Sequence, residues 1–493
     1  MSDGTFARSL LLKVYGFAWT LARPVLQHNK RLREGFSWRL VPEDWAGLQV
    51  ASPLGQATRK NTVPAPTIPA HVDVWIQAAS GGEAYLVWEL LKRLPEALAD
   101  SAAQHDKPLR VLVTTWTRQG LEVLHGMAAT LGKEHPELSI HITFFPLDAP
   151  RIMARALDQA RPRVVVLLET ELWPGLMLGC ARRNIPVLVQ NGRMTDKSLH
   201  GYRLLDGCAH GFWQSVAPAR VAAVSSADAA RFAELFGAER VTIVPNIKFD
   251  RALPAAPCVA PTEASPIGTS LLPATLHHGR TVLFASAREE EEEVLIATIR
   301  LLRAKTPAPT ILVAPRHMHR VDAWRKKLAK AGLPALFRSE WKTETEGHTE
   351  AAPALAPIPA GSLVLWDRFG KLNSLYLLAD AVFVGGSLAP LGGQNFLEPL
   401  ALGKIPCCGP HLENFAWALQ STTGDEPGAS DALEALGLLR RCRTAKTLAH
   451  LLQDALEHPV DPATVRQRFT AWLTPRVGGS LHCAKQIATA LKE

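Results

Sequence analysis

The stretch RVVVLLET, residues 163–170, decides the fold, because its apolar residues run without a break from Val164 to Leu168. A strand with one face in water alternates apolar and polar residues, whereas a strand covered on both faces is apolar throughout. The stretch therefore predicts a fully buried strand of a parallel sheet. It ends on an acid, Glu169, and an acid at the end of a buried strand needs a partner or water.

The same pattern recurs along the chain. In the first half the predicted strands are VDVWIQA (72–78), LRVLVTTWT (109–117), IHITFFP (140–146), RVVVLLET, IPVLVQNG (185–192), RVAAVSS (220–226) and RVTIVPNI (240–247). In the second half they are TVLFASA (281–287), PTILVAPRH (309–317), LPALFRS (333–339), GSLVLWD (361–367), ADAVFVGG (379–386) and KIPCCGP (404–410). Helical stretches between them, such as 85–98 and 151–160, indicate βαβ units and hence parallel sheets.

At 493 residues the chain is too long for one ordinary hydrophobic core. The alternation stops between residues 251 and 278, a stretch rich in Pro, Ala and Ser that we interpret as a linker. We expect an α/β protein of the GT-B architecture, with two Rossmann-like, doubly wound parallel-sheet domains facing a cleft. The predicted domains are residues 41–250 and 279–493, with 1–40 as a separate N-terminal segment and 341–361 as a surface loop.

Residues 1–40 combine positive charge with a short apolar stretch. They contain seven Lys and Arg residues against two acids, which gives +5 of a total formal charge of +8. The stretch SLLLKVYGFAWTLA, residues 9–22, is shorter than the ~17–25 apolar residues of a spanning helix and has no small-residue cleavage site. We expect a helix in the membrane interface, with Phe17 and Trp19 inserted among the lipids. The alternative is a helix packed on the protein's own surface.

The distribution of charge and the spacing of the cysteines argue against nucleic-acid-binding, zinc-binding and disulfide-rich proteins. Beyond the first 40 residues the charges are mixed and form no basic stripe, so we expect no nucleic-acid partner. The seven cysteines include no C-x-x-C pair and no cluster with histidine, which disfavours a zinc site or a disulfide framework. A reduced, cytoplasmic compartment fits this usage.

The first predicted strand is followed by ASGGE, which brings Glu83 to its carboxyl end. Ligands of doubly wound sheets bind beyond the carboxyl ends of strands, so Glu83 is a candidate general base. Ser80 and Glu83 also have the S-x-x-E spacing of a capping box, and the sequence leaves both interpretations open. The segment is not G-x-G-x-x-G, and no acid follows the second strand, so a nicotinamide cofactor is disfavoured.

Further charged side chains follow other strands of the first domain. Glu169 and Glu171 are two residues apart, so on an extended chain both carboxylates point the same way. They are candidates for a site, and ordinary solvated acids at a strand end are the alternative. Four cations follow later strands and could receive an anionic group, namely Arg193, Lys197, Arg203 and Lys248.

In the second domain, Pro315 and Arg316 end a strand, and the planar guanidinium group suits a phosphate. The acidic run 289–293 is interpreted as the solvated start of a helix. The segment Phe369-Gly370-Lys371 is a loop between a strand and a helix that could touch a base or a phosphate.

The stretch GGSLAPLGGQNFLEPLALGK, residues 385–404, places two glycine pairs before the start of a helix. Bare backbone at such a place can hold an anion on its N–H groups. We interpret it as a loop that binds a phosphate-bearing nucleotide, with Glu398 accepting from the ribose hydroxyls; Asn395 and Glu398 could instead be only a capping pair. The chain contains no D-x-D motif. Cations and amides, rather than a metal, would then meet the charge of the leaving group.

These motifs are similar to those of a known family. ASGGE, ETELWPGL, NGRMTDKSLHGY, NIKFD, APRH and GGSLAPLGGQNFLEPLALGKIPCCGPHLENF occur in order between about residues 70 and 415. On these motifs the chain resembles the 3-deoxy-D-manno-octulosonic acid (Kdo) transferases of Gram-negative bacteria, which act in lipopolysaccharide biosynthesis.

The resemblance implies an inverting, metal-independent glycosyltransferase at the cytoplasmic face of the inner membrane, held there peripherally or by its N-terminal segment. It would transfer Kdo from CMP-Kdo to a tetraacylated lipid A precursor, lipid IVA, without a cofactor. Residues 41–250 would bind the acceptor and 279–493 the nucleotide sugar. Glu83 matches the catalytic base, and Glu169, Glu171 and Lys248 match groups that stabilise the transition state. The positions that match CMP contacts are Pro315, Arg316, Phe369, Gly370, Lys371, Asn395, Phe396, Leu397 and Glu398.

The chain departs from the family's motifs at several positions. Gly81 and Gly175 replace a Val and an Asn, and Arg288 replaces a His; Leu391 and Gln394 replace an Arg and a His of the glycine loop. Two other functions are compatible with the sequence. One is a related GT-B lipid glycosyltransferase that uses a UDP-sugar, and the other is a non-catalytic, nucleotide-binding protein of the membrane surface.

Overall fold

The computed structural model describes residues 3–29, 32–33, 35–41, 68–99, 107–208, 211–252, 279–340, 359–368, 372–419 and 432–493. The chain divides into two compact units. Unit 1 comprises Met1–Arg251 and Arg476–Glu493, and unit 2 comprises Ala252–Pro475. The predicted linker, from residue 253 on, and most of the predicted loop 341–361 lie outside the described residues.

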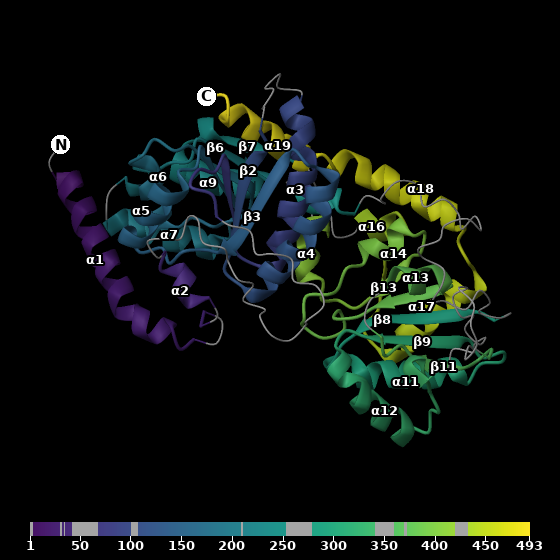
Figure 1. Ribbon diagram of the computed structural model, residues 1–493. Helices are drawn as coiled ribbons and strands as arrows, with labels where there is room; N and C mark the ends of the chain where they lie inside the picture. Colours follow the sequence, from purple (N-terminus) through teal and green to yellow (C-terminus); the bar gives the residue numbers. More distant parts are fainter. Residues whose placement is uncertain are drawn as a thin grey trace, which may run out of the picture. The chain divides into compact units, whose positions relative to one another are not determined.

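Unit 1 is built on a parallel sheet of seven described strands in the order β3-β2-β1-β4-β5-β6-β7 (Figure 1). Its strands are β1 (Val74–Ala78), β2 (Leu109–Thr115), β3 (Leu138–Phe144), β4 (Val164–Leu168), β5 (Val187–Gly192), β6 (Arg220–Ala223) and β7 (Val241–Ile243). Its helices are α1 (Asp3–Leu26), α2 (Phe36–Arg39), α3 (Gly81–Ala99), α4 (Arg118–Glu134), α5 (Pro150–Ala160), α6 (Pro174–Ala181), α7 (Asp196–Cys208), α8 (Phe212–Ser215), α9 (Ser226–Phe236), α10 (Ile247–Asp250) and α19 (Gly479–Ala490).

Both faces of this sheet are buried, which explains the unbroken apolar run of β4. Successive side chains of a strand point to opposite faces. Val164, Val166 and Leu168 therefore join a core with α3, α4 and α19. Val165 and Leu167 join a second core with α5, α6 and α9. The interpretation of the run as a strand covered on both sides is confirmed.

Helix α19 belongs to unit 1, although its residues come after all of unit 2 in the chain. In Figure 1 it lies beside α3, and its Cys483 and Ile487 enter the core between α3 and the sheet. The carboxylate of Asp250 accepts hydrogen bonds from the N–H groups of Gly478 and Ser480, both at 2.6 Å, and so fixes the start of the helix. The sequence prediction had grouped these residues with 279–493, because helical periodicity does not say which sheet a helix covers.

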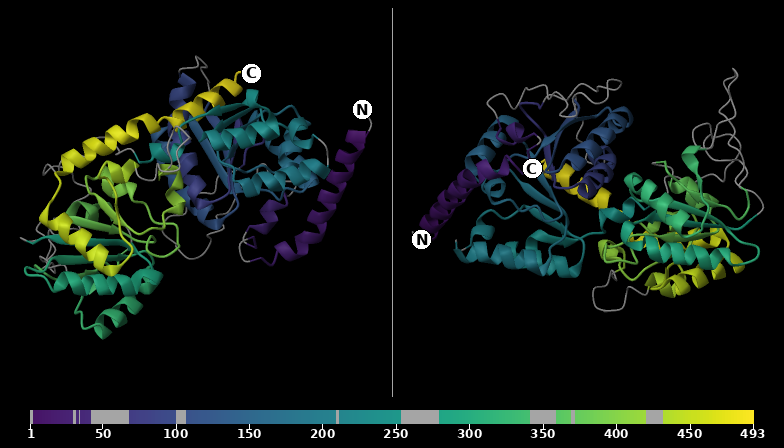
Figure 2. Two further views of the ribbon diagram at one scale, coloured as in Figure 1. Left: turned by 180° about the vertical axis from the view of Figure 1, so that it is seen from behind. Right: turned by 90° about the horizontal axis from the view of Figure 1, so that it is seen from below.

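The N-terminal helix α1 lies on the outside of unit 1, next to α5 (Figure 2). The hydroxyl of Tyr15 donates to Asp148 Oδ2 at 2.9 Å, and Asp148 is fully buried. The same carboxylate accepts from the N–H groups of Gly175 and Leu176, both at 2.7 Å, at the start of α6. Burial raises the pKa of Asp148 to about 7, although these three donors lower it.

Unit 2 repeats the architecture with its described strands in the order β10-β11-β9-β8-β12-β13-β14, all parallel. Its strands are β8 (Thr281–Ala287), β9 (Thr310–Pro315), β10 (Leu336–Phe337), β11 (Leu363–Leu365), β12 (Ala381–Val384), β13 (Pro406–Cys408) and β14 (Arg440–Arg441). Its helices are α11 (Glu292–Arg303), α12 (Val321–Lys330), α13 (Leu372–Leu378), α14 (Leu397–Ala401), α15 (Ala416–Leu419), α16 (Ala432–Ala435), α17 (Ala445–Glu457) and α18 (Pro462–Leu473).

The observed strands agree with the predicted segments, and the order of the strands locates a switch point in each sheet. Each predicted strand segment overlaps an observed strand, and β14 is the additional one in the described residues. In each sheet the chain reverses its winding at one place, between β1 and β4 in unit 1 and between β8 and β12 in unit 2. In doubly wound sheets ligands bind outside the carboxyl ends of the strands at this switch point.

Candidate functional site

The predicted acids of unit 1 flank its switch point. Glu83 follows β1 in the first turn of α3, and Glu169 and Glu171 follow β4, which pairs with β1. Lys248 reaches the same place from α10, where it forms an ion pair with Glu169. The structure thus brings together the four residues that the sequence motifs nominated.

Glu83 makes the capping contacts that its spacing predicted. Its Oε2 accepts from the N–H of Ala79 at 2.6 Å, and its Oε1 accepts from the hydroxyl of Ser80 at 3.0 Å. Desolvation and the charges of Glu171 and Glu169 outweigh these bonds and raise the pKa of Glu83 to about 7. The two interpretations of the S-x-x-E segment are therefore compatible: the cap holds in place a carboxyl that can exchange a proton near neutral pH.

Glu169 is compensated by cations. Its Oε1 lies 2.6 Å from Lys248 Nζ and 3.7 Å from Arg193 Nη1. Its backbone is left-handed, with a φ of 54°, a conformation that costs a residue with a side chain ~1–3 kcal/mol. This strained turn directs the carboxylate toward the two cations that follow β5 and β7.

Glu171 is held by neutral donors instead. Trp173 Nε1 donates to its Oε2 at 2.7 Å, and Gln77 Nε2 approaches the same oxygen at 3.5 Å. Gln77 is itself fixed inside the sheet, because its Oε1 accepts from the Thr114 hydroxyl at 2.7 Å. Burial raises the pKa of Glu171 despite these donors. In the described part of the chain Glu83 and Glu171 are thus half-buried acids bonded to neutral donors, whereas Glu169 pairs with two cations, Lys248 and Arg193.

The side chains that support Glu171 were not among the residues predicted from the sequence. Gln77 and Trp173 touch Glu171 directly, and neither belonged to the nominated set. Gln77 carried a signal, since it is a polar residue inside a strand that is otherwise buried and apolar. Trp173 carried no functional signal in the sequence, because an aromatic residue before a helix is ordinarily interpreted as part of the hydrophobic core.

In unit 2 the predicted donor residues come to the carboxyl edge of adjacent strands. Arg316 follows β9, where its N–H donates to the Ala287 carbonyl at 2.9 Å and its side chain is exposed. Arg288, which stands where the family has a His, follows β8, and the charges of Arg288 and Arg316 add to burial in lowering the pKa of His317. Arg288 and Arg316 therefore bring positive charge to this edge, and Glu290 lies 3.8 Å from the Arg288 side chain.

The glycine loop holds an anion, but that anion belongs to the protein. The N–H groups of Gly386, Ser387 and Leu388 donate to the carboxylate of Glu291 at 2.7, 2.9 and 2.8 Å. The expectation that the run 289–293 is a solvated helix start is therefore wrong at its centre, where Glu291 and Glu292 are fully buried.

Each of the two buried acids has its own partners. Glu292 pairs with Arg320 at 3.0 Å and with Lys327 at 2.7 Å, whereas Glu291 bonds to backbone.

The rest of the nominated loop is partly buried. Asn395 Nδ2 donates to Glu398 Oε1 at 2.8 Å, and Asn395 Oδ1 accepts from the N–H of Leu397 at 3.1 Å, which is the capping pair that the sequence left open. The side chains of Phe396 and Leu397 are buried in the core, so a ligand could meet only their backbone. Pro315 is likewise buried as the last residue of β9. Phe369, Gly370 and Lys371 lie outside the described residues.

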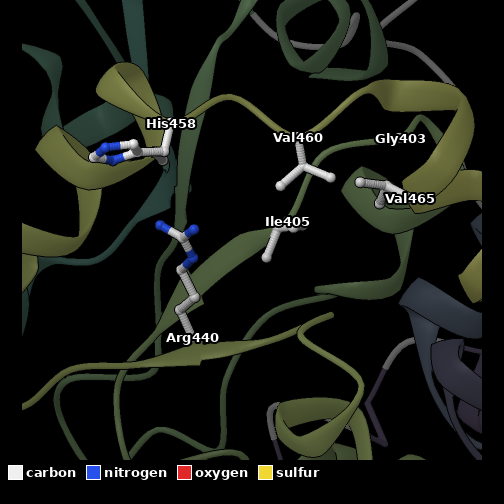
Figure 3. A pocket seen from close by; sticks show the side chains of 7 residues that line it. Gly403, Ile405, Arg440, His458, Val460 and Val465 are labelled. Atoms are coloured by element: carbon white, nitrogen blue, oxygen red, sulfur yellow. The ribbon is translucent and has the colours of Figure 1, made fainter.

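A small pocket elsewhere in unit 2 does not belong to this site. It has a volume of about 30 Å³ and lies beside Gly403 and Ile405, which precede β13, and Arg440, the first residue of β14 (Figure 3). It therefore opens at the amino ends of these strands, opposite the glycine loop. Its charged groups are paired, because Asp454 bridges Arg440 at 3.0 Å and His458 at 3.1 Å.

Within the described residues no group of three or more His, Cys, Asp or Glu side chains is placed to hold a metal ion. Two doubly wound parallel sheets, with an acid cluster at one switch point and a glycine loop at the other, form the GT-B architecture.

Comparisons with known proteins give the family. The family model "3-Deoxy-D-manno-octulosonic-acid transferase (kdotransferase)" matches residues 49–251. The 3-deoxy-D-manno-octulosonic acid transferase of Bordetella pertussis is 30% identical over 420 residues, which cover 84% of this chain and 86% of the relative. That of Haemophilus influenzae is 29% identical over 345 residues, or 69% of this chain and 71% of the relative. The chain belongs to the Kdo transferase family.

Among solved structures, the C-terminal CMP-Kdo binding domain of WaaA from Acinetobacter baumannii is similar at 24% identity and a TM-score of 0.31, over 40% of this chain and 91% of that domain. Acinetobacter baumannii MurG is similar at 14% identity and a TM-score of 0.44, over 85% of this chain and all of that chain. The family assignment rests on the sequence matches.

Proposed function

We propose that this Kdo transferase moves Kdo from CMP-Kdo to a hydroxyl of a tetraacylated lipid A precursor, lipid IVA, with inversion at the anomeric carbon. The supporting observation is the carboxyl of Glu83, which burial and two neighbouring acids bring to a pKa of about 7 beside the switch point of unit 1. A base with this pKa is half deprotonated at neutral pH and strong enough to assist a hydroxyl.

The proposed reaction is a direct displacement. Glu83 takes the proton of the acceptor hydroxyl while that oxygen forms a bond to the anomeric carbon of Kdo. The bond from this carbon to the phosphate oxygen breaks, and CMP leaves with the electron pair. General-base assistance of this kind contributes roughly 10²–10⁴-fold to the rate.

Lys248 and Arg193 are cations that pair with Glu169 of the acid cluster, and we assign them to the carboxylate of the transferred sugar. Glu169 would hold both cations in position, because it already pairs with Lys248 at 2.6 Å. Glu171, which accepts from Trp173 and Gln77, would add negative charge near the positive charge that develops on the sugar.

The CMP leaving group is assigned to unit 2, which would make it the donor domain and unit 1 the acceptor domain. Arg316 and Arg288 supply positive charge at the carboxyl edge of β8 and β9, and Glu398 would accept from the ribose hydroxyls. Residues 369–371 are assigned to the same nucleotide on their motif alone. In this proposal cations, and no metal ion, balance the charge of the phosphate.

We place the enzyme at the cytoplasmic face of the inner membrane through α1. Val14, Phe17, Leu21 and Val25 are each at least 59% exposed and recur at helical spacing along one face. Trp19, which we expected on that face, is half-buried and packs edge-on against Tyr15. No helix in the described residues is both long and apolar enough to span a membrane. An exposed apolar stripe within a segment of charge +5 suits a helix lying on anionic lipids.

The test is mass spectrometry of the lipid after incubation with CMP-Kdo, and in parallel with UDP-N-acetylglucosamine. We expect addition of Kdo from the first donor and no transfer from the second. Glu83→Gln should bind CMP as the wild type does and lose at least 100-fold in turnover. Wild-type turnover in this variant would remove Glu83 from the role, and sugar transfer from the uridine donor would overturn the proposed substrate. Proton NMR of the isolated product reports the anomeric configuration.

A further inference from the structure

Glu291 is a buried carboxylate whose bonding capacity is filled by backbone. Its Oε2 accepts from Gly386 at 2.7 Å and from Arg288 at 3.2 Å, and its Oε1 accepts from Ser387 at 2.9 Å and Leu388 at 2.8 Å. The side chain is completely buried. An ionised carboxylate offers about four acceptor positions, and these four N–H groups fill them.

These bonds join the two sides of the switch point of unit 2. Glu291 and Arg288 follow β8, whereas Gly386, Ser387 and Leu388 follow β12, the neighbouring strand. The two segments approach so closely that a Cβ on Gly385 would lie 2.4 Å from the carbonyl oxygen of Ser286, which explains the glycine there. Gly386 adopts a φ of 69°, which turns its N–H and the next two toward the carboxylate.

The second half of the loop is in turn attached to the first half. The N–H of Gly393 donates to the Gly386 carbonyl at 2.7 Å, and that of Gln394 donates to the Gly385 carbonyl at 3.1 Å. Asn395, which pairs with Glu398, follows directly. A continuous set of contacts therefore leads from Glu291 through 385–388 and 393–394 to the residues assigned to the nucleotide.

We propose that Glu291 is a positioning residue for the donor: an internal anion that occupies the amide nest of the glycine loop and fixes the nucleotide-binding residues beyond it. This inference rests on the proposed function, since it takes 395–398 as the site of CMP. It also changes the interpretation of the glycine loop. The amides of 386–388 are not available to the donor phosphate, whose charge falls to the arginines at the carboxyl ends of β8 and β9.

The test is the kinetics of Glu291→Gln, in which an amide nitrogen replaces one acceptor and faces N–H groups that need one. We expect the KM for CMP-Kdo and the Kd of CMP, measured by calorimetry, to rise at least tenfold, while the KM for the lipid acceptor stays within about twofold of the wild type. A role limited to folding would instead lower the active fraction, and with it kcat, at unchanged donor KM. Glu293→Gln, an exposed acid of the same run, is the matched control and should behave as the wild type.

The outcomes separate the two proposals. If the wild type transfers no Kdo from CMP-Kdo, the proposed function fails and the inference fails with it. If the wild type transfers Kdo and Glu291→Gln keeps its donor KM, the inference alone is overturned. Should Glu291→Gln not fold, Glu291→Asp decides, because it keeps both oxygens but withdraws them from the loop. A donor KM above that of the wild type supports the inference, and a wild-type value contradicts it.

Discussion

Glu83 carries a carboxyl whose pKa depends on its neighbours as well as on its burial. The largest cause of its raised pKa is desolvation, and the charge of Glu171 comes next. A base must be deprotonated to act, so below a pKa of about 7 the rate should fall roughly tenfold for each pH unit. The pH dependence of kcat/KM thus reports on this cluster.

We predict that Glu171→Gln shifts the rising limb of the pH profile to lower pH. The substitution removes a like charge, which lowers the pKa of Glu83, while the amide oxygen can still accept from Trp173. The shift is partial because burial remains. Measurement of kcat/KM for CMP-Kdo between pH 5 and 9 checks it, with Glu122→Gln, an exposed acid of α4, as the control. A limb that stays in place or moves to higher pH would contradict the assignment of Glu83 as the base.

At the scale of elements, α1 is attached to unit 1 through a buried acceptor. Tyr15 supplies one of the three donors to Asp148, which also fixes the start of α6. Loss of the hydroxyl leaves a fully buried carboxylate with two donors. We predict that Tyr15→Phe lowers the free energy of unfolding by about 1–3 kcal/mol and speeds tryptic cleavage in α1 after the exposed Lys13.

Urea denaturation and limited proteolysis measure the two effects. The control is Thr20→Val, which also removes a hydroxyl from α1. That hydroxyl is exposed and donates to the Gly16 carbonyl of its own helix at 3.0 Å, so the change should stay within about 0.5 kcal/mol. Equal stability of Tyr15→Phe and the wild type would show that the helix is held by its other contacts.

The strands of both sheets were predictable, because burial on two faces makes every residue of a strand apolar, as in β4. Strand β14 was not, since Arg440 and Arg441 form a two-residue edge strand that exists only because β13 offers its backbone. The acids Glu83, Glu169 and Glu171 were predictable as residues after strands. The partners of these acids were not predictable. Lys248 and Arg193 reach Glu169, and Gln77 reaches Glu171, from segments that follow or belong to other strands, and the spacing of the acids in the sequence does not reveal these contacts.

The buried Glu291 illustrates a further limit of sequence patterns. Its partner Gly386 is 95 residues away, and that partner is a backbone N–H group, which every residue except proline possesses. An acidic run before a helix ordinarily predicts solvated side chains that favour the helix dipole. The glycine loop predicted an anion, which we assigned to a nucleotide phosphate, whereas the amides of 386–388 bind the carboxylate of Glu291.

For the whole molecule, the exposed stripe of α1 predicts binding to lipid surfaces. Phe17→Ser combined with Leu21→Ser should weaken binding to vesicles with 30% phosphatidylglycerol at least tenfold, because burial of each such side chain contributes roughly 1.5–3 kcal/mol. Sedimentation with vesicles measures this, and binding should also fall with added salt. Leu204→Ser, an equally exposed leucine of α7, is the control. Unchanged binding in the double variant would exclude α1 as the contact.

The course of the chain through unit 1 has a consequence for how the protein is made. Helix α19 completes the core over α3, yet its residues leave the ribosome only after every strand of unit 2. During synthesis the sheet of unit 1 therefore exposes apolar surface until α19 has been made. A nascent chain with such exposed surface is prone to aggregate and to bind chaperones. A fragment ending at Arg251 would keep this bare flank permanently, and it should aggregate unless residues 476–493 are supplied as a separate peptide.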